Sequence, residues 1–411
     1  MKRRAVLFAL LVIATLPGAA QSIVPDLYQA IARYFNPDPN AGLTAFRSLN
    51  IPMGGLAEGM GMAYTAVSKD SSYFESNPAA SSSLEATELS VYHNNWIGDT
   101  KVEGAVYTIR YKGLGFGIGG KWLYLPFVGT DDFGDNIGSG NYSEASAGFN
   151  ISYNFFQGYY FSGFAVGATG KVAYRAVPSS LTEAIGNSAI AIMVDGGILT
   201  RFNFMKFYSS RSKNAAVGLT VKNFGPAVLG EALPTSASLG LAYSPLKPFL
   251  FSADITKPLN LLQPAKSESF IYAIGFMLSV TDFFRFQTGF LLKGGNPRLS
   301  VGSSFDIDLL KVTVNYTLDL TTQFTPLNRI SIQAGFSLGD LGRAELAKKV
   351  ETLYLTGLEA YARGDVVSAI GAWSSTLELD PSFDPARESL RAAMGSEDLK
   401  KGIEELQRLE K

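Results

Sequence analysis

The fold is decided by ten residues, Arg329-Ile330-Ser331-Ile332-Gln333-Ala334-Gly335-Phe336-Ser337-Leu338, in which apolar residues alternate without a break with polar or small ones. This period of two predicts a β-strand with one oily face and one polar or small face. The same division recurs in residues 236–244 and 311–319. Periodicity alone does not tell a soluble sheet, whose apolar face is inside, from a barrel, whose apolar face meets lipid.

The composition favours the lipid-facing alternative. The chain of 411 residues contains 42 Gly, 28 Phe and 19 Tyr, and only 17% of its residues are charged. After the N-terminus no second long apolar run occurs, as expected when only every other strand residue faces lipid. Several aromatic residues lie near the ends of predicted strands, where interfacial girdles form: Tyr107, Tyr111, Phe249, Phe251, Phe283, Phe284 and Phe286. Many positions expected on the inner face are glycines, which would let strands surround a plugged lumen: Gly115, Gly117, Gly119, Gly148, Gly163, Gly167, Gly275 and Gly289.

About fourteen such segments follow one another between residues 88 and 339, with turn residues and no helical pattern between them. They include the ranges 114–125, 141–154 and 159–174. The fold predicted is therefore an all-β transmembrane barrel of about 14 antiparallel strands with an N-terminal plug and a small C-terminal α-helical module. An even strand number puts both ends of an outer-membrane barrel in the periplasm.

The N-terminus predicts export. Lys2, Arg3 and Arg4 precede an apolar run over residues 5–16, and small residues follow at Gly18 and Ala20. This is typical of a cleaved signal peptide, predicted over residues 1–20, and the run is too short to remain as a membrane-spanning helix. The sequence thus predicts a protein of the bacterial outer membrane, in contact with its lipid.

The residue counts also exclude several functions. The net charge is −1, so nothing recruits nucleic acid. With no Cys and one His, the chain has no disulfides and almost no nitrogen or sulfur ligands for a metal centre. His93 has no Ser/Asp signature around it and is expected to be structural. We therefore expect no catalytic residues, no cofactor and no enzymatic activity.

The most specific motif precedes the first predicted strand. It reads GMGMAYTAVSKD over residues 59–70 and YFESNPA over residues 73–79. This series resembles the FadL-like outer-membrane transporters and the related PorV-type barrels, which carry a Gly-x-Gly-x-Ala, Thr-Ala, Asp and Asn-Pro-Ala series before about fourteen strands. The matching residues are Gly59, Gly61, Ala63, Asp70, Asn77, Pro78 and Ala79. The chain departs from the pattern at Ala80, where a Gly is usual, and at Glu75-Ser76, where less polar residues are usual.

The resemblance implies a hatch. Residues 21–87 would form an N-terminal periplasmic or hatch segment within a barrel of residues 88–339, and hydrophobic compounds such as long-chain fatty acids would pass through. The residue types alone, without the resemblance, predict local structure. Gly59 and Gly61 permit close backbone approach or positive φ, and Asn77-Pro78 forms a turn. We expect these residues to shape the plug rather than to contact the ligand. An amphipathic helix is predicted over residues 26–35.

The predicted inward positions mix apolar and polar side chains. Val106, Met277 and Leu291 are apolar positions among polar or small neighbours. Such a lumen suits an amphipathic ligand, and the same residues also suit packing against a plug. Three arginines are placed either to hold a carboxylate head group or to pair with plug carboxylates: Arg110, Arg285 and Arg329.

After Gly339 the composition becomes helical, and residues 340–411 form a separate predicted module. Its middle resembles a tetratricopeptide repeat through Gly357, Ala369, Trp373 and Pro381, and departs from it at Ala360, where a Tyr is usual. One such repeat cannot bury its own apolar face, so helices around residues 390–409, or a partner, would cover it.

Two functions follow from these observations. The first is uptake of hydrophobic or amphipathic compounds through an outer-membrane channel whose periplasmic module, residues 344–411, docks a periplasmic protein. The alternative is a PorV-like docking or secretion component that holds protein clients through that module. Fatty-acid uptake separates the two.

Overall fold

The computed structural model describes residues 38–130, 133–178, 187–320 and 329–395. The predicted signal peptide, the predicted amphipathic helix over residues 26–35 and the end of the C-terminal module lie outside these ranges.

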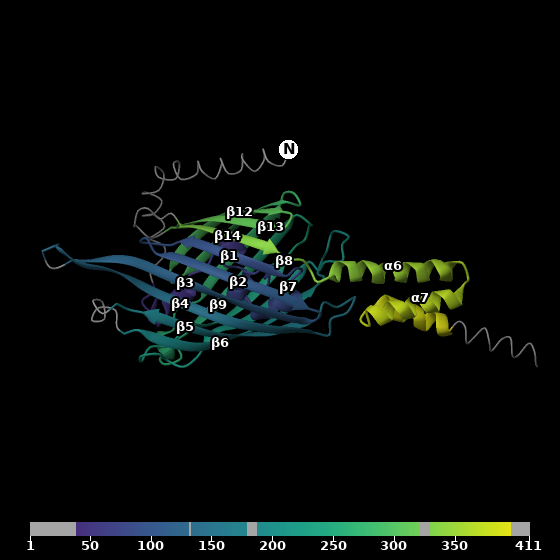
Figure 1. Ribbon diagram of the computed structural model, residues 1–411, viewed down its shortest axis with the longest axis horizontal. Helices are drawn as coiled ribbons and strands as arrows, with labels where there is room; N and C mark the ends of the chain where they lie inside the picture. Colours follow the sequence, from purple (N-terminus) through teal and green to yellow (C-terminus); the bar gives the residue numbers. More distant parts are fainter. Residues whose placement is uncertain (1–37, 131–132, 179–186, 321–328, 396–411) are drawn as a thin grey trace, which may run out of the picture.

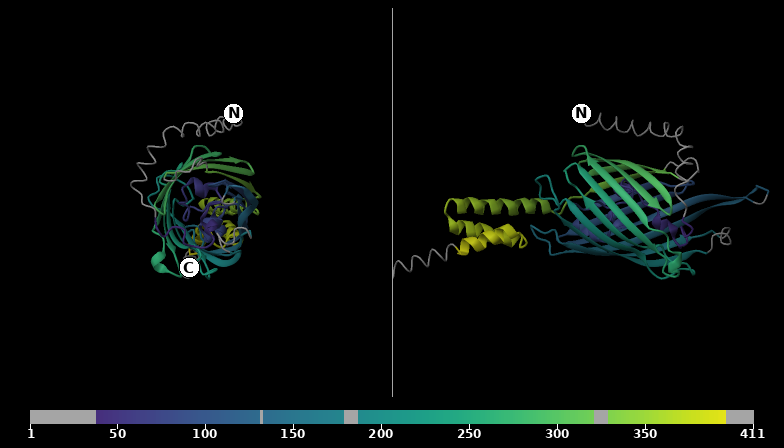
Figure 2. Two further views of the ribbon diagram at one scale, coloured as in Figure 1. Left: turned by 90° about the vertical axis from the view of Figure 1, so that its left-hand side faces the viewer. Right: turned by 180° about the vertical axis from the view of Figure 1, so that it is seen from behind.

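Fourteen antiparallel strands close into one barrel, in which every strand pairs with its neighbours in sequence and β1 pairs with β14 (Figures 1 and 2). The predicted barrel and its strand number are confirmed. The strands are β1 (Glu88–Asn95), β2 (Lys101–Tyr111), β3 (Leu114–Thr130), β4 (Asn136–Phe155), β5 (Phe164–Ala176), β6 (Ala189–Phe202), β7 (Ala215–Phe224), β8 (Thr235–Tyr243), β9 (Phe249–Leu259), β10 (Ile271–Ser279), β11 (Phe284–Lys293), β12 (Asn296–Ile307), β13 (Leu310–Asp319) and β14 (Arg329–Ser337).

The two faces of the strands have the predicted orientation. In β14, Ser331 and Gln333 are buried in the lumen, while Ile332 and Phe336 are each 42% exposed on the outer surface. Strand β8 repeats this arrangement, with Leu239 and Leu241 outside. Because the apolar face points outward, the hydrophobic surface of the wall surrounds the barrel instead of forming its core.

The largest differences from the predicted strand boundaries occur in two places. β3 and β4 are longer than the predicted ranges 114–125 and 141–154, and their hairpin extends beyond the neighbouring strands (Figure 1). β5 begins at Phe164 instead of residue 159. The chain before it turns at Gly163, which has a φ of +83°, and Tyr159 packs edge-on against Phe383 of the C-terminal module. The aromatic residues around Tyr159 are therefore of types that favour a strand, but in the structure they lie in the turn before β5.

A segment of the chain fills the barrel lumen (Figure 2, left). We call residues 38–87 the plug. It contains short helices joined by turns: η1 (Arg47–Asn50), α3 (Gly55–Gly59), α4 (Tyr73–Ser76) and η2 (Pro78–Ser83). Nearly every residue from position 52 to position 82 is buried. The only other short helix between strands in the described ranges is η4 (Pro264–Lys266), which lies between β9 and β10.

Both ends of the barrel sequence meet on one side, where Thr87 N–H donates to Gly339 O at 2.7 Å. The C-terminal module continues from there with α6 (Arg343–Ala362), α7 (Val366–Leu379) and a third helix over residues 384–395 (Figure 1). Trp373 is the centre of its small core and is 1% exposed. No helix within the described ranges has both the length and the apolar character needed to cross a membrane.

Candidate functional site: the plug and the lumen cavity

The plug backbone lies directly on the barrel wall where the wall carries glycine. Gly61 adopts a φ of +61°, and a Cβ atom at this position would lie 2.6 Å from Phe290 N. Opposite it, a Cβ atom on Gly289 of β11 would overlap Met60 and Gly61. Further wall glycines lie against plug backbone: Gly115, Gly167, Gly218, Gly240 and Gly275. Gly117 and Gly197 lie against the plug side chains of Tyr73 and Asn77. Glycine here allows backbone to approach backbone closely, which any side chain would prevent.

The predicted inward glycines fall into three groups. Gly115, Gly117, Gly167, Gly275 and Gly289 contact the plug, as predicted. Gly119 and Gly148 instead meet other atoms of the wall, and Gly163 lies in the β4–β5 turn. The sequence therefore indicates a glycine-rich inner face but not which glycines touch the plug.

Asn77 joins two parts of the plug to the wall. Its side chain is fully buried, and its amide nitrogen donates to Thr65 O at 2.9 Å and to Ile198 O of β6 at 3.1 Å. Its amide oxygen accepts from Ala79 N–H at 3.1 Å and so caps η2. Pro78 follows as the first residue of that helix, where its missing N–H has no cost. The Asn-Pro-Ala element is therefore a structural tie within the plug.

The remaining motif residues are also buried in the plug. Gly59 approaches Asn315 of β13, and a Cβ atom on Gly59 would lie 2.5 Å from Asn315 Oδ1. Ala63 is fully buried against Ala273 and Leu291 of the wall. Asp70 accepts hydrogen bonds from Tyr64 Oη at 2.8 Å and from Gln333 Nε2 at 3.3 Å.

Polar side chains of the wall bind the plug backbone and its carboxylates. Asp254 of β9 accepts from Tyr64 N–H and Thr65 N–H at 3.1 and 2.9 Å. Thr317 Oγ1 donates to Glu58 Oε1 at 3.1 Å, and Asn94 Nδ2 donates to Glu58 Oε2 at 3.2 Å. Burial raises the pKa of Glu58, although hydrogen bonds from Ser331 and Thr317 act in the opposite direction. The plug–wall interface is thus largely polar, and water can satisfy these groups if the plug moves.

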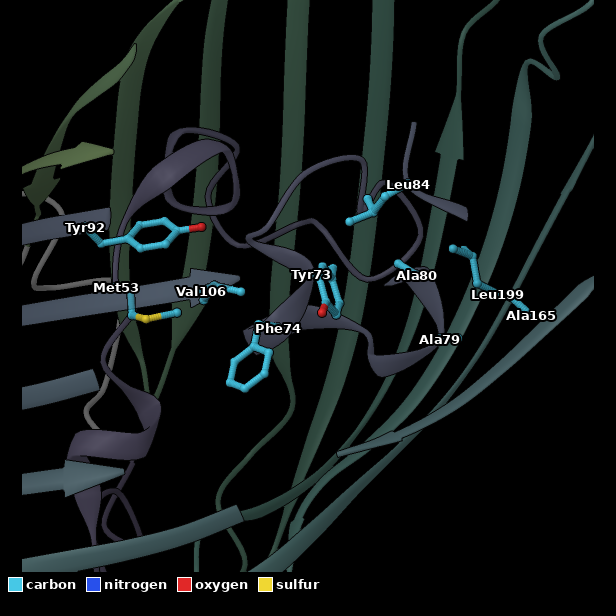
Figure 3. Close-up of a cluster of buried hydrophobic side chains, with 10 residues drawn as sticks. All are labelled: Met53, Tyr73, Phe74, Ala79, Ala80, Leu84, Tyr92, Val106, Ala165 and Leu199. Carbon is cyan, nitrogen blue, oxygen red and sulfur yellow. The ribbon is translucent and has the colours of Figure 1, made fainter. Parts of the chain in front are cut away.

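The apolar side of the plug packs against small or apolar wall residues (Figure 3). One cluster groups Met53, Tyr73 and Phe74 of the plug with Val106 of β2. Met277 belongs to a second cluster of this kind, and Leu291 to a third. Of the two roles open to the inward apolar residues, packing against the plug is the one that these contacts support. Ala80, where the motif departs from its usual Gly, is fully buried in the first cluster.

The wall arginines do not pair with plug carboxylates, contrary to one of the two roles predicted for them. Arg285 pairs with Asp306 at 2.8 Å, and Arg329 pairs with Asp319 at 2.8 Å, both within the wall. Arg110 donates to the backbone oxygen of Leu84. The two carboxylates come from adjacent strands. Side chains one register step apart on neighbouring strands lie within reach of each other.

A cavity lies between the plug and the barrel end opposite the C-terminal module. It encloses about 1640 Å³ of space not filled by atoms, part of it open to solvent. Lys293 lines it at the end of β11, which places this opening away from the end where β14 meets the module. Its lining includes seven basic side chains against four acidic ones among the described residues. The cavity therefore combines apolar walls, such as Phe74 and Leu291, with an excess of positive charge.

The sequence does not predict the ion pair at this cavity. Glu75 of α4 accepts from Lys121 Nζ of β3 at 2.6 Å and from Met53 N–H at 2.8 Å. Lys222 Nζ of β7 donates to the backbone oxygen of Glu75 at 3.1 Å. The available signal was the departure of Glu75 from the usual motif, together with two lysines at inward positions of predicted strands.

The C-terminal module is compact and touches the barrel. A Cβ atom on Gly357 would overlap the Trp373 ring, and Ala369 is fully buried beside it, so α6 and α7 approach closely. Trp373 Nε1 donates to Tyr354 O at 3.2 Å, and α7 ends two residues before Pro381. Against the barrel, Glu351 of the module forms two hydrogen bonds with Arg211 in the β6–β7 turn, at 2.6 and 3.2 Å: Nη2 to Oε1 and Nη1 to Oε2.

The closed barrel, the packed lumen segment and the cavity above it define a plugged β-barrel. The chain belongs to UPF0164, described as an uncharacterised protein family, whose model matches residues 32–340. That match covers the plug and the whole barrel and ends where the helical module begins. Two UPF0164 proteins of Treponema pallidum (strain Nichols) are each 29% identical to this chain. One alignment covers 86% of this chain and 83% of the relative, and the other covers 84% and 74%.

Solved structures with a similar fold include two from Pseudomonas. The toluene transporter TodX of P. putida is 13% identical, with a TM-score of 0.47, and covers 70% of this chain and 98% of its own. A FadL homologue of Pseudomonas aeruginosa is 11% identical, with a TM-score of 0.42, and covers 68% of this chain and 97% of its own.

Proposed function

We propose that this protein is a non-catalytic channel of the bacterial outer membrane that takes up hydrophobic or amphipathic compounds, long-chain fatty acids among them. The observation that carries the proposal is the cavity between the plug and the open end of the barrel, which offers a ligand both apolar and charged side chains. Pockets for amphipathic molecules combine these two kinds of surface.

The outer surface supports the membrane assignment. Large apolar side chains alternate along the strands and face outward, for example Ile192 at 64% and Ile274 at 61% exposure. A continuous apolar surface of this extent is unstable in water, and a closed barrel leaves no unpaired strand edge in lipid. The module end of the barrel would then face the periplasm, consistent with an even strand number.

The plug supports transport through the lumen. Many of its contacts with the wall are hydrogen bonds, which water can replace, and its apolar contacts are divided among separate clusters. Such a segment closes the barrel to solutes and can rearrange at a moderate cost in free energy. A continuous hydrophobic core would make this rearrangement much more costly.

A second function is favoured by one observation, the attachment of the C-terminal module to the barrel. The module has its own core around Trp373 and contacts the β4–β5 and β6–β7 turns through Phe383 and Glu351. Uptake alone needs no such module. We therefore retain a docking role, in which the tetratricopeptide-like module in the periplasm binds a protein that receives the cargo or is itself a client of a PorV-like barrel.

The test is uptake of labelled fatty acid by cells that lack their own transporter. The full protein is compared with a variant whose wall clashes with the plug, Gly289→Val, and with the matched variant Gly196→Val, where a Cβ atom meets nothing within 4 Å. Uptake by the full protein and the Gly196 variant, with an altered rate in the folded Gly289 variant, supports a plug-controlled channel.

No uptake by the correctly folded full protein would contradict the channel. A pull-down with the full chain and with a variant lacking residues 344–411 tests the docking role separately, because only the full chain should retain the partner.

A further inference from the structure

Two turns of the barrel are bound on one surface of the C-terminal module, which stands at the end of the barrel (Figure 1). The β4–β5 turn packs the ring of Tyr159 edge-on against Phe383, with ring centroids 5.0 Å apart. Tyr159 N–H donates to Asp384 Oδ2 at 3.2 Å. The hydroxyl of Tyr160 donates to Glu388 Oε2 at 3.1 Å. The module residues in these contacts lie in the third helix or directly before it.

Helix α6 forms the other side of this surface. Tyr354 packs edge-on against Phe383, with ring centroids 5.3 Å apart. One helical turn earlier, Glu351 accepts two hydrogen bonds from Arg211 of the β6–β7 turn. The Arg211 guanidinium lies 5.7 Å from the centre of the Tyr159 ring, so the two turns meet on the module. We call this surface the docking face and define it by Glu351, Tyr354, Phe383, Asp384 and Glu388.

The docking face and the turns that it holds are complementary in charge. Three of its five residues are carboxylates and two carry aromatic rings, whereas the turns bring two tyrosines and an arginine. Lys213 Nζ donates to Tyr160 O at 2.7 Å and adds a second cation beside the same turn. Within the module, Arg387 pairs with Asp384 at 2.8 Å, so this carboxylate has a partner of its own. The other two carboxylates of the docking face are bound by groups of the barrel.

The module has a core that is separate from these contacts. Its core cluster consists of module residues alone, from Val350 to Ala393. On the barrel side, Tyr160 is 57% exposed, and the Arg211 and Glu351 side chains are 64% and 42% exposed. Contacts between such exposed groups contribute little free energy, because water competes for each of them. The turns are therefore held on the surface of a folded module and can leave it without unfolding it.

We propose that the docking face binds a segment of another protein that carries two adjacent aromatic residues and a basic residue, and that the two barrel turns occupy this face as an internal ligand. The bound turns indicate the chemistry of the partner: a ring packs against Phe383, a hydroxyl binds Glu388 and a cation binds Glu351. The partner segment displaces the turns and so releases the module from the barrel. This inference rests on the proposed docking role and names the surface and the chemistry of its partner.

The competition between turn and partner can be measured with a peptide. Because the turns belong to the same chain, they compete at a high effective concentration, and a free peptide binds more tightly once they are removed. The probe is a labelled peptide with the sequence of residues 156–163 followed by one arginine, and a second peptide has serine in place of both tyrosines. Binding is measured on the full chain in lipid nanodiscs.

The variants separate the internal ligand from the docking face. The double variant Tyr159→Ser and Tyr160→Ser removes the internal ligand, and its control is Phe156→Ser, which changes an 82% exposed aromatic residue of the same turn. Glu388→Lys, added to the double variant, alters the docking face. Its matched control in the same background is Glu378→Lys, which changes an exposed carboxylate of α7.

We expect the tyrosine peptide to bind about tenfold more tightly to the double variant than to the unchanged protein. Addition of Glu388→Lys should weaken this binding by about tenfold or more, because a cation then faces the hydroxyl and the arginine of the peptide. Addition of Glu378→Lys should change the binding by less than about twofold, and Phe156→Ser should bind as the unchanged protein does. The serine peptide should bind to none of these proteins.

Equal binding to the unchanged protein and the double variant would show that the turns do not occupy the site. Absence of binding to every variant would show that the contacts only hold the module in place. Either result overturns the proposal. The pull-down with and without residues 344–411 distinguishes this failure from that of the docking role. A partner that needs the module while the peptide does not bind overturns only this surface, whereas a partner retained equally without the module contradicts the docking role itself.

Discussion

Replacement of Asn77 by Ala should loosen the plug without opening the barrel. The substitution removes the amide that donates to Thr65 O and Ile198 O and accepts from Ala79 N–H. Thr65 O and Ala79 N–H are buried and lose these partners, while Ile198 lies within the β6 ladder. An unsatisfied buried group costs about 1–3 kcal/mol, so plug opening should become easier by about 2–4 kcal/mol.

Hydrogen exchange measured on the full chain tests this value. A change of about 2–4 kcal/mol in opening free energy accelerates exchange in residues 64–80 by roughly 30- to 1000-fold. The strands should keep their protection, because their ladder bonds are untouched. Asn95→Ala, at an exposed position at the end of β1, is the matched control and should change exchange by less than about threefold. Unchanged protection of residues 64–80 in Asn77→Ala would refute the assignment of Asn77 as a tie.

Three other changes test separate parts of the structure. Gly289→Val should weaken the plug–wall contact by about 1–3 kcal/mol, because the added side chain overpacks it, and should therefore raise ion conductance in planar bilayers. Gly196→Val should change neither quantity. Trp373→Ala should destabilise the module by about 3–5 kcal/mol, so that a protease removes it while the barrel stays intact; resistance equal to that of the unchanged chain contradicts this. A double-mutant cycle on Arg211 and Glu351 should give a coupling of only about 0.2–1 kcal/mol, because both side chains are exposed; several kcal/mol would show that the module is rigidly held.

The strand alternation was readable from sequence because it is a local property. In β14, the side chains of Ser331 and Gln333 had to face opposite to Ile332 and Phe336 whatever the neighbouring strands were. Turn residues then divided the chain into fourteen strands. Strand ends are not a local property in the same way. The aromatic residues of the β4–β5 turn suit a strand equally well, and the contact of Tyr159 with Phe383 forms only in the folded chain.

Part of the candidate site can also be predicted from the sequence. Asn77-Pro78 predicts a turn from its own chemistry, and the structure places this turn within the plug. In the sequence, Glu75 differs from its neighbours only as a departure from the motif. Its partner Lys121 is 46 positions away, and no spacing rule connects two residues brought together by barrel closure.

A barrel with an apolar outer face can be predicted from the amino-acid sequence alone, since each strand carries its own alternation and its own turns. Which glycines meet the plug, and whether an inward arginine binds a carboxylate or a backbone oxygen, follow only from the closed barrel. These features depend on the register between strands and on the position of residues 38–87 in the lumen. A shift of one residue would exchange every inward side chain for an outward one, so closure of the barrel selects the partners.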